Sequence, residues 1–576
     1  MEPLRQTQTW SRSWSLVVLI AVLLPSQKVH CLAPPHPDFV DFEGVHAYRR
    51  RMNITYGYRP VHLSDEDCRF LSEEECQRED EAHIEAKNRL MVEGEHGRRR
   101  LAPSEGEFRV MVMLCRFKDH TNVQLPPKEH FEELFNGKGK SDINPIGSIA
   151  SYLYYSSMGK YKVTFDIQDW QTTDREESYY AKGTGGRNGN LAMQEVFTPL
   201  LERLDASMSR SESFQFWLQY DRGGDPVWGG DGILDQLVVI HSGYPAEQGD
   251  RNCGHPSYLD RIWSQGSGSS SGGWQNQDGN FRLGGYTLAS AWAAVCQTLP
   301  NTMGIITHEY LHAFFLPDLY DQDSNDEAVA IGGVGSYDIM ANAYGWDRQS
   351  AYPGSMSAYS RVDAGWLDPI EITTDGVYAI QPAEISSQVY KIASPYPFGE
   401  YLLIENRQPI KWNKWPAGGI VITHVDEQKP NQGQRGYPGK SGWPAEHYRV
   451  AIQQKDGLYQ LEKGDNLGDE GDFFVEGDVL GPGPNKFPNT DAYSSGRAIR
   501  TGLTIKVLSR PGFIMSFEVS GLGGSAPWSP PDGDLGSIDP SAVAELAGEG
   551  TGDAMHWVFG LIGGLGLVIG IAVVLL

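Results

Sequence analysis

The chain has 576 residues, with 74 acidic and 48 basic side chains, so its formal net charge is -26 and its pI is about 5.0. This acidic balance disfavours nucleic acids and anionic membrane surfaces as partners, and it suits an extracellular protein with acidic cation sites. The length is enough for about three domains with a large hydrophobic core.

The first segment, residues 1–31, has the pattern of a secretory signal peptide. Arg5 and Arg12 precede an apolar run from Leu16 to Leu24, which is too short to span a bilayer. A plausible cleavage site follows at residues 29–31. The sequence therefore predicts entry into the secretory pathway.

Residues 32–100 are predicted to form a propeptide. They are rich in charge, poor in strand periodicity, and end in Arg98-Arg99-Arg100, which is a natural site for proteolytic cleavage. Cleavage there starts the mature chain near Leu101. The segment also holds the only usable N-glycosylation sequon, at Asn53.

Residues 101–370 are predicted to form an α/β catalytic domain, because strand and helix patterns alternate from residue 105 onward. A Gly/Ser-rich run from Gly266 to Gly273 is interpreted as a mobile connection within this domain.

The run His308-Glu309-Tyr310-Leu311-His312 is the motif in this domain that carries chemistry. Residues four apart share one face of a helix, so His308 and His312 are placed to offer imidazole nitrogens to one metal ion, with Glu309 beside it. Zinc accepts neutral imidazole, and a catalytic zinc site has three protein ligands and a water. Glu309 is then the candidate general base for attack of water on a polarised carbonyl. The alternative is a pair of helix histidines satisfied by ordinary hydrogen bonds.

The helix that carries this motif has predictable limits. Asn301 and Thr302 are candidate N-caps, and Pro317 disfavours helical geometry at the residue before it, so the helix is expected to end near Phe315. A continued helix would rotate Asp318 away from the histidines. A turn would instead bring its carboxylate back as the third metal ligand.

Residues 371–520 change to short strands separated by turns, a pattern that predicts a β-sandwich-like C-terminal domain. The expected strands are Tyr401–Glu405, Gly419–Val425, Tyr448–Gln453, Leu503–Leu508 and Ile514–Val519. Within this region an acidic Gly-containing loop offers oxygen ligands for calcium, although solvated acidic turns have the same composition. The candidate calcium ligands are Asp465, Asn466, Asp469 and Asp472.

The last two segments are predicted to hold the protein at a membrane. Residues 521–552, rich in Gly, Pro, Ser and Asp, are interpreted as a flexible stalk. Residues 553–576 form a hydrophobic C-terminal segment with no basic tail, which fits either a GPI-attachment signal or a membrane-spanning helix.

Beyond the motif, the chain resembles the M6 or immune inhibitor A-like metallopeptidases over roughly residues 105–520. The resemblance is carried by the segments 108–119, 147–160, 235–243, 308–321, 335–340 and 365–369. It implies an α/β zincin of metzincin-like type, with zinc bound by His308, His312 and Asp318 and with Met340 in the Met-turn. The chain departs from the family at Phe315, where the pattern has a glycine that turns the backbone with positive φ. Asp321 and Asp323 are the nearest substitute ligands if the turn is rebuilt.

Six cysteines are too few for a disulfide scaffold. The predicted disulfides are Cys68 with Cys76 and Cys253 with Cys296, while Cys115 lies in an apolar strand and is predicted to be a buried, unpaired thiol. A role for Cys68 or Cys76 as a zinc-blocking thiol of the propeptide is the alternative to their disulfide.

These observations together predict a secreted or surface-anchored zinc endopeptidase that is made as a proenzyme and acts on proteins or peptides. Zinc is the expected cofactor and calcium a further candidate. The alternative is a surface adhesion or binding protein that keeps the peptidase fold without catalysis.

Overall fold

The computed structural model describes residues 105–523, apart from short internal segments. These segments are 188–189, 222–231, 250–256, 268–273, 294–298, 322–331, 347–349, 411–412, 430–431, 433–435, 484–486 and 494–495. All described residues belong to one of the two compact units into which the chain divides, Ala33–Leu576. The predicted signal peptide, propeptide, C-terminal segment and nearly all of the stalk lie outside the described residues, as do Asn53, Asp323 and the cysteines of both predicted disulfides.

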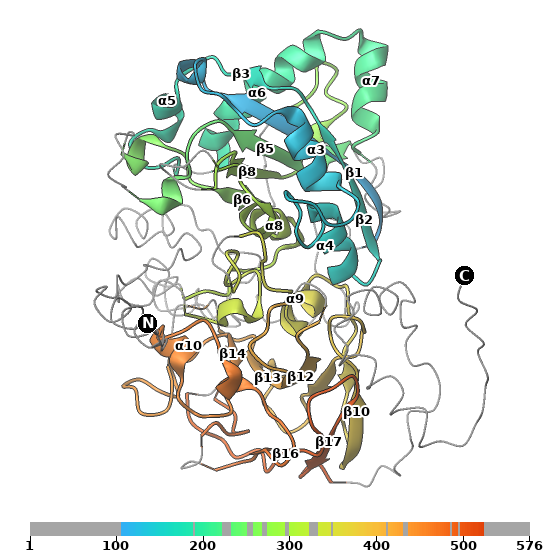
Figure 1. The fold of residues 1–576 in the computed structure, drawn as a ribbon, viewed down its shortest axis with the longest axis vertical. Coiled ribbons are helices and arrows are strands. Elements are labelled where there is room, and N and C mark those ends of the chain that lie inside the picture. The colour runs from blue at the N-terminus through green and yellow to red at the C-terminus, as the bar shows by residue number, and fades with distance from the viewer. Residues whose placement is uncertain are drawn as a thin grey trace, which may run out of the picture. The chain divides into compact units, whose positions relative to one another are not determined.

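A six-stranded, mainly parallel sheet organises the N-terminal part of the described chain (Figure 1). Five strands follow in the order β2-β1-β5-β8-β6, and β3 pairs with the end of β1. Strand β6 alone runs antiparallel to its neighbour, β8. The strands are β1 (Gly106–Arg116), β2 (Tyr161–Ile167), β3 (Gln171–Thr172), β5 (Leu237–His241), β6 (Gln265–Ser267) and β8 (Tyr286–Ser290).

Helices cover both faces of this sheet, because alternate residues of a strand point to opposite sides. Val110, Val112 and Leu114 of β1 pack in one core with α3 (Lys128–Asn136), α4 (Ile149–Ser156) and α8 (Met303–Leu311). Met111, Met113 and Cys115 pack in a second core with α5 (Glu177–Ala181), α6 (Asn190–Ala206) and α7 (Arg210–Leu218). This arrangement confirms the predicted α/β character. Cys115 is fully buried and unpaired, as expected, and burial raises the pKa of its thiol.

The C-terminal part contains two further sheets. One has the order β10-β17-β16-β15 and is antiparallel, and the other has the order β14-β13-β12-β11-β9. Apolar side chains from both sheets form a common core that includes Ile404, Ile422 and Phe517. The strands are β9 (Ile370–Glu371), β10 (Gly376–Ile380), β11 (Tyr390–Ile392), β12 (Glu400–Arg407), β13 (Gly419–Asp426), β14 (Val450–Ile452), β15 (Val479–Leu480), β16 (Thr504–Val507) and β17 (Met515–Ser520).

The remaining described elements are short. They are the two-stranded pair β4 (Ile233–Leu234) and β7 (Arg282–Leu283), the helices α9 (Ala358–Asp363) and α10 (Gln460–Lys463), and the 3-10 turns η2 (Lys118–His120), η3 (Ala246–Gln248), η4 (Tyr258–Asp260), η5 (His312–Phe314), η6 (Gly335–Tyr337) and η7 (Glu470–Asp472). In the part of the chain that the structure describes, none of the helices is both long and apolar enough to cross a membrane.

A buried arginine joins the β-rich part to the peptide chain before α9. Arg407, at the end of β12, has 1% of its surface exposed and pairs with Glu405 at 3.0 Å. Its guanidinium also donates to the Met356 carbonyl at 2.8 Å and lies over the Trp415 ring. A buried charge is tolerated only when it is paired and hydrogen-bonded, so loss of one partner would be costly. The two parts of the described chain therefore share a specific polar contact as well as apolar packing.

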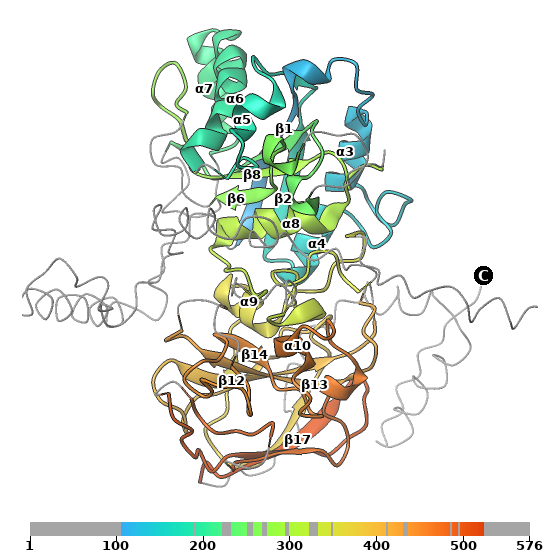
Figure 2. The ribbon, with the colours of Figure 1, turned by 90° about the vertical axis from the view of Figure 1, so that its left-hand side faces the viewer.

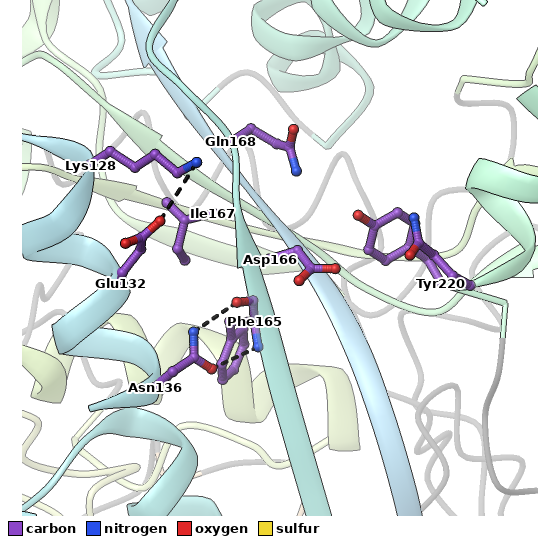
Figure 3. Close-up of a pocket in the computed structure, with 9 residues that line it drawn as sticks. Lys128, Glu132, Asn136, Phe165, Asp166, Ile167, Gln168 and Tyr220 are labelled. Atoms are coloured by element: carbon purple, nitrogen blue, oxygen red, sulfur yellow. Dashed lines mark hydrogen bonds and ion pairs between the residues drawn. The ribbon is translucent and has the colours of Figure 1, made fainter. Parts of the chain in front are cut away.

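The outer edge of the parallel sheet is closed by a side chain. Strand β2 ends the sheet, and its Phe165 backbone would otherwise present an unpaired N–H and C=O. Asn136, at the end of α3, donates to the Phe165 carbonyl at 2.7 Å and accepts from its N–H at 2.9 Å, as Figure 3 shows. The Asn136 amide thus makes the two hydrogen bonds that a residue of a neighbouring strand would make. It lies beside a surface hollow that is also lined by Lys128, Glu132 and Tyr220.

We predict that Asn136→Ala lowers the free energy of unfolding by about 1–3 kcal/mol, because the backbone groups of Phe165 lose both partners. Urea denaturation measures this change. Glu132→Ala on the same helix is the control, since it removes only an exposed ion pair with Lys128, worth about 0–1 kcal/mol. Equal stability of the two variants would refute the edge-closing role of Asn136.

Candidate active site

Helix α8 carries the His-Glu-His motif and is buried along its whole length. It packs against β6 and β8, as seen in both views (Figures 1 and 2). Thr302 is the N-cap residue by position, but its side chain makes no capping hydrogen bond. Ser350 caps the helix from a distant segment instead, because its hydroxyl accepts from Ile305 N–H at 3.0 Å and its carbonyl from Gly304 N–H at 2.8 Å. The prediction that the Thr302 side chain caps the helix was therefore wrong, while Asn301 Oδ1 accepts from Thr302 N–H at 2.8 Å just before the helix.

The helical segment ends at Phe314, near the predicted limit at Phe315, but its last turn is not α-helical. The α-helical part stops at Leu311, and the 3-10 turn η5 continues through His312 to Phe314. Phe315 then has φ 59° and ψ 22°, in the left-handed region, and its N–H donates to the His312 carbonyl at 3.0 Å. The chain thus makes the positive-φ turn expected of a glycine, at a cost of about 1–2 kcal/mol for a residue with a Cβ. This turn directs the following segment back toward α8.

The turn brings Asp318 to both histidines. Its Oδ1 atom lies 3.2 Å from His308 Nε2 and 3.3 Å from His312 Nε2. Among the described residues, His308, Glu309 and His312 also form a group whose potential ligand atoms lie within 4.8 Å of one another. Glu309 Oε2 is 3.9 Å from His312 Nε2, so Asp318 is closer to the histidines than Glu309 is. The carboxylate oxygen nearest to both imidazole nitrogens is therefore that of Asp318.

These three atoms fit a zinc ion. Two ligands that each lie about 2.0–2.1 Å from a tetrahedral zinc are about 3.3 Å apart, close to the spacings of Asp318 Oδ1 from the two imidazoles. The Nδ1 atoms of both rings are hydrogen-bonded to backbone carbonyls. His308 Nδ1 contacts the Ile339 carbonyl at 2.9 Å, and His312 Nδ1 contacts the Leu316 carbonyl at 2.8 Å. Carbonyl partners require an N–H at Nδ1, so Nε2 is the atom of each ring that faces Asp318 and is placed to bind a metal.

The electrostatics of the cluster favour a cation. Burial acts to lower the pKa of His312, but the charges of Asp318 and Glu309 outweigh it and raise the pKa to about 9. Burial likewise acts to raise the pKa of Asp318, and the two histidines instead hold it well below its usual range. The buried carboxylate is thus ionised at neutral pH and provides negative charge where a metal ion would bind.

Glu309 has the environment of a proton acceptor. Burial raises the pKa of its carboxyl, Asp318 adds to the increase, and the two histidines act against it. A carboxylate with a raised pKa is a stronger base than a solvated one, which suits proton transfer from water. Its side chain has 5% of its surface exposed, and its Oε2 atom lies 3.9 Å from His312 Nε2.

Strand β6 approaches this helix so closely that only glycine fits at residue 266. A Cβ on Gly266 would lie 2.2 Å from the Glu309 carbonyl oxygen and 3.0 Å from His312 Cβ. Ser264, just before the strand, is fixed by Glu247, whose carboxylate accepts from the Ser264 hydroxyl at 2.7 Å and from its N–H at 3.1 Å. The interpretation of Gly266 as part of a mobile connection was therefore wrong, because Gly266 pairs with β8.

Sequence reasoning missed Gly266, Glu247 and Ser350. Their roles depend on how β6 and the Ser350 segment meet α8, which no local pattern reports. The Gly/Ser composition at residue 266 was a signal, but it was assigned to flexibility rather than to close packing.

The segment with Met340 is hydrogen-bonded to the cluster through the neighbouring Ile339 carbonyl, which contacts His308 Nδ1. Met340 is fully buried, its N–H donates to Asp338 at 2.8 Å, and its carbonyl accepts from Leu319 N–H at 2.9 Å. Asp321, one of the two substitute third ligands, is buried too, whereas Asp318 is the carboxylate that lies 3.2 Å from His308 Nε2 and 3.3 Å from His312 Nε2. Burial and the charge of Asp321 raise the pKa of Tyr448 well above its usual range, which places Asp321 beside the β-rich part.

The candidate calcium loop uses its oxygens in hydrogen bonds. Asp469 accepts from Gly471 N–H and from the Asn466 amide, both at 2.7 Å. Asp472 accepts from Asp469 N–H at 3.0 Å and from the Tyr337 hydroxyl at 2.9 Å, and burial raises its pKa to about 7. The loop thus contacts the segment before Met340. Calcium binding by Asp465, Asn466, Asp469 and Asp472 stays a prediction.

Comparison with known proteins identifies relatives of this region. Residues 118–367 match the model of the immune inhibitor A peptidase M6 catalytic domain. The pre-pro-metalloprotease PrtV of two Vibrio cholerae serotype O1 strains is 25% identical over 285 residues, which cover 46% of this chain and 29% of PrtV. Immune inhibitor A of Bacillus thuringiensis subsp. alesti is 26% identical over 234 residues, covering 37% of this chain and 34% of that protein. The chain thus spans about a third of the length of these curated relatives.

We predict that Gly266→Ala destabilises the protein by about 1–3 kcal/mol, because its Cβ overlaps the Glu309 carbonyl and forces β6 away from α8. Urea unfolding measures the change. Gly512→Ala is the matched control, since its Cβ would meet nothing closer than 4.0 Å. If both variants unfold at the same urea concentration, the close approach of β6 to α8 is not as described.

Proposed function

We propose that this chain, whose residues 118–367 belong to the immune inhibitor A peptidase M6 family, is a zinc-dependent endopeptidase that hydrolyses peptide bonds in protein substrates. The observation that carries the proposal is the convergence of His308 Nε2, His312 Nε2 and Asp318 Oδ1 at spacings of 3.2 and 3.3 Å. Three protein ligands with an open fourth position are typical of catalytic rather than structural zinc.

Each residue of the site has a distinct role in this proposal. His308, His312 and Asp318 would hold the zinc ion, which when bound supplies a Lewis acid that polarises the peptide carbonyl and acidifies water. Glu309 accepts the proton of the attacking water and returns it to the leaving amine. The carbonyls of Ile339 and Leu316 keep the imidazole rings oriented, so that the rings do not rotate when charge develops.

Several finer features belong to the same proposal. The metzincin-like type is supported by the turn at Phe315 and the Met340 segment, and the β-sandwich by the shared core of the two C-terminal sheets. Secretion and synthesis as a proenzyme are supported by the sequence of residues 1–100 and by the name of PrtV as a pre-pro-metalloprotease. Membrane attachment through residues 553–576 stays a prediction from sequence.

The role of Glu309 is tested by Glu309→Gln. This variant is expected to keep its fold and its zinc while losing at least about 100-fold in kcat on casein, because only proton transfer is removed. Zinc per mole of protein and casein cleavage are the two measurements. Glu132→Gln, an exposed carboxylate on α3, is the control and should keep full activity. Retained activity in Glu309→Gln would contradict the role of Glu309 as proton acceptor, whereas a parent protein that binds zinc without cleaving casein would favour a binding protein.

The third ligand is tested by a matched pair of variants. Asp318→Asn removes a charged ligand and is expected to weaken zinc binding about tenfold or more, whereas Asp321→Asn should leave zinc affinity within about twofold of the parent. Competition with a chelator measures both affinities. If Asp321→Asn weakened zinc binding and Asp318→Asn did not, the metal ligand would be Asp321 and not Asp318.

A further inference from the structure

The peptide segment that carries Asp318 is held by the β-rich C-terminal part. Leu319 follows Asp318 directly, and its backbone N–H donates to the Met340 carbonyl at 2.9 Å. The Leu319 carbonyl accepts from Val334 N–H at 3.1 Å and from the side-chain amide of Gln432 at 3.3 Å. The position of the ligand segment therefore depends on a side chain from a distant part of the sequence.

Gln432 is fixed in the orientation that this contact needs. Its side chain is buried, with 1% of the residue surface exposed. The amide nitrogen donates to the Val450 carbonyl at 2.8 Å, and the amide oxygen accepts from Val450 N–H at 2.8 Å. Because Val450 begins β14, the amide is attached to the sheet on one side and to Leu319 on the other. Both amide hydrogens and the oxygen thus have partners.

A second contact supports the neighbouring segment in the same way. The Tyr337 hydroxyl donates to Asp472 at 2.9 Å, and Ser336 N–H donates to the Leu467 carbonyl at 2.9 Å. A Cβ on Gly468 would lie 2.5 Å from the Tyr337 ring, so the loop packs directly on it. This segment leads into Ile339, the residue whose carbonyl orients His308.

The turn at Phe315 explains why such support is needed. A residue with a Cβ persists at positive φ only where the surrounding structure enforces that conformation. Phe315 is partly exposed and has φ 59°, so its own side chain is not held by deep burial. Gln432 holds Leu319, which follows this turn closely in the chain, and Tyr337 holds the segment before Ile339.

We propose that Gln432 is a positioning residue for the metal site, so that the C-terminal part fixes Asp318 in place and compensates for the strain at Phe315. The proposal rests on the proposed function only in taking zinc as the metal. Asp318 binds the ion, and Gln432 acts through Leu319 without touching it.

The test measures the zinc affinity of the full chain by chelator competition, with kcat and KM on casein as second readouts. Gln432→Ala is expected to weaken zinc binding about tenfold, as loss of an outer-shell partner does. Gln408→Ala is the matched control, because this buried amide just after β12 donates to Asn406 at 2.7 Å and should leave zinc affinity unchanged.

The substitution Phe315→Gly is expected to restore part of the zinc affinity that Gln432→Ala loses. Glycine holds a positive φ without strain, so Gln432→Ala should weaken zinc binding less in the Phe315→Gly background than in the parent. An equal loss in both backgrounds, or no loss in Gln432→Ala relative to Gln408→Ala, would overturn the proposal. If Gln432→Ala does not fold, Tyr337→Phe replaces it. That variant removes one hydroxyl and should weaken zinc binding severalfold, and unchanged affinity there would equally overturn the proposal.

The outcome is separate from that of the proposed function. A parent protein that binds zinc but does not cleave casein would refute the peptidase, while the zinc affinities of the variants would still decide the role of Gln432.

Discussion

One carboxylate oxygen organises the centre of this protein. Asp318 Oδ1 faces His308 Nε2 at 3.2 Å and His312 Nε2 at 3.3 Å, in a buried site where an unpaired charge would be expensive. The two imidazoles are fixed at their other nitrogens by backbone carbonyls. The capped helix α8, the turn at Phe315 and the Met340 segment all serve to keep these three atoms together.

Segments that are distant in sequence pack closely against α8 and cap it. Gly266 of β6 lies against the backbone of Glu309, and Glu247 fixes Ser264 just before that strand. Ser350 satisfies the first N–H groups of the helix, since Thr302 does not. Distant segments of the chain thus supply what the helix sequence lacks, which makes the site sensitive to changes that are remote from the metal ligands.

Local sequence patterns predicted much of this arrangement. The four-residue spacing of His308 and His312 placed both on one face, and the strand patterns of the C-terminal part located β12, β13, β16 and β17 to within a few residues. Contacts between segments far apart in sequence were not predictable. The 3-10 turn from His312, the cap by Ser350 and the support by Gln432 depend on packing that no periodicity encodes. The acidic loop illustrates the limit, because its composition fits calcium while its side chains bond one another and Tyr337.

Zinc-edge X-ray diffraction from crystals of the full chain, grown with zinc, tests the central claim most directly. We predict one anomalous peak, bound by Nε2 of His308, Nε2 of His312 and Oδ1 of Asp318, with Glu309 outside the ligand sphere. A peak ligated by Asp321 in place of Asp318, or a zinc ion bound away from α8, would contradict this account of the site.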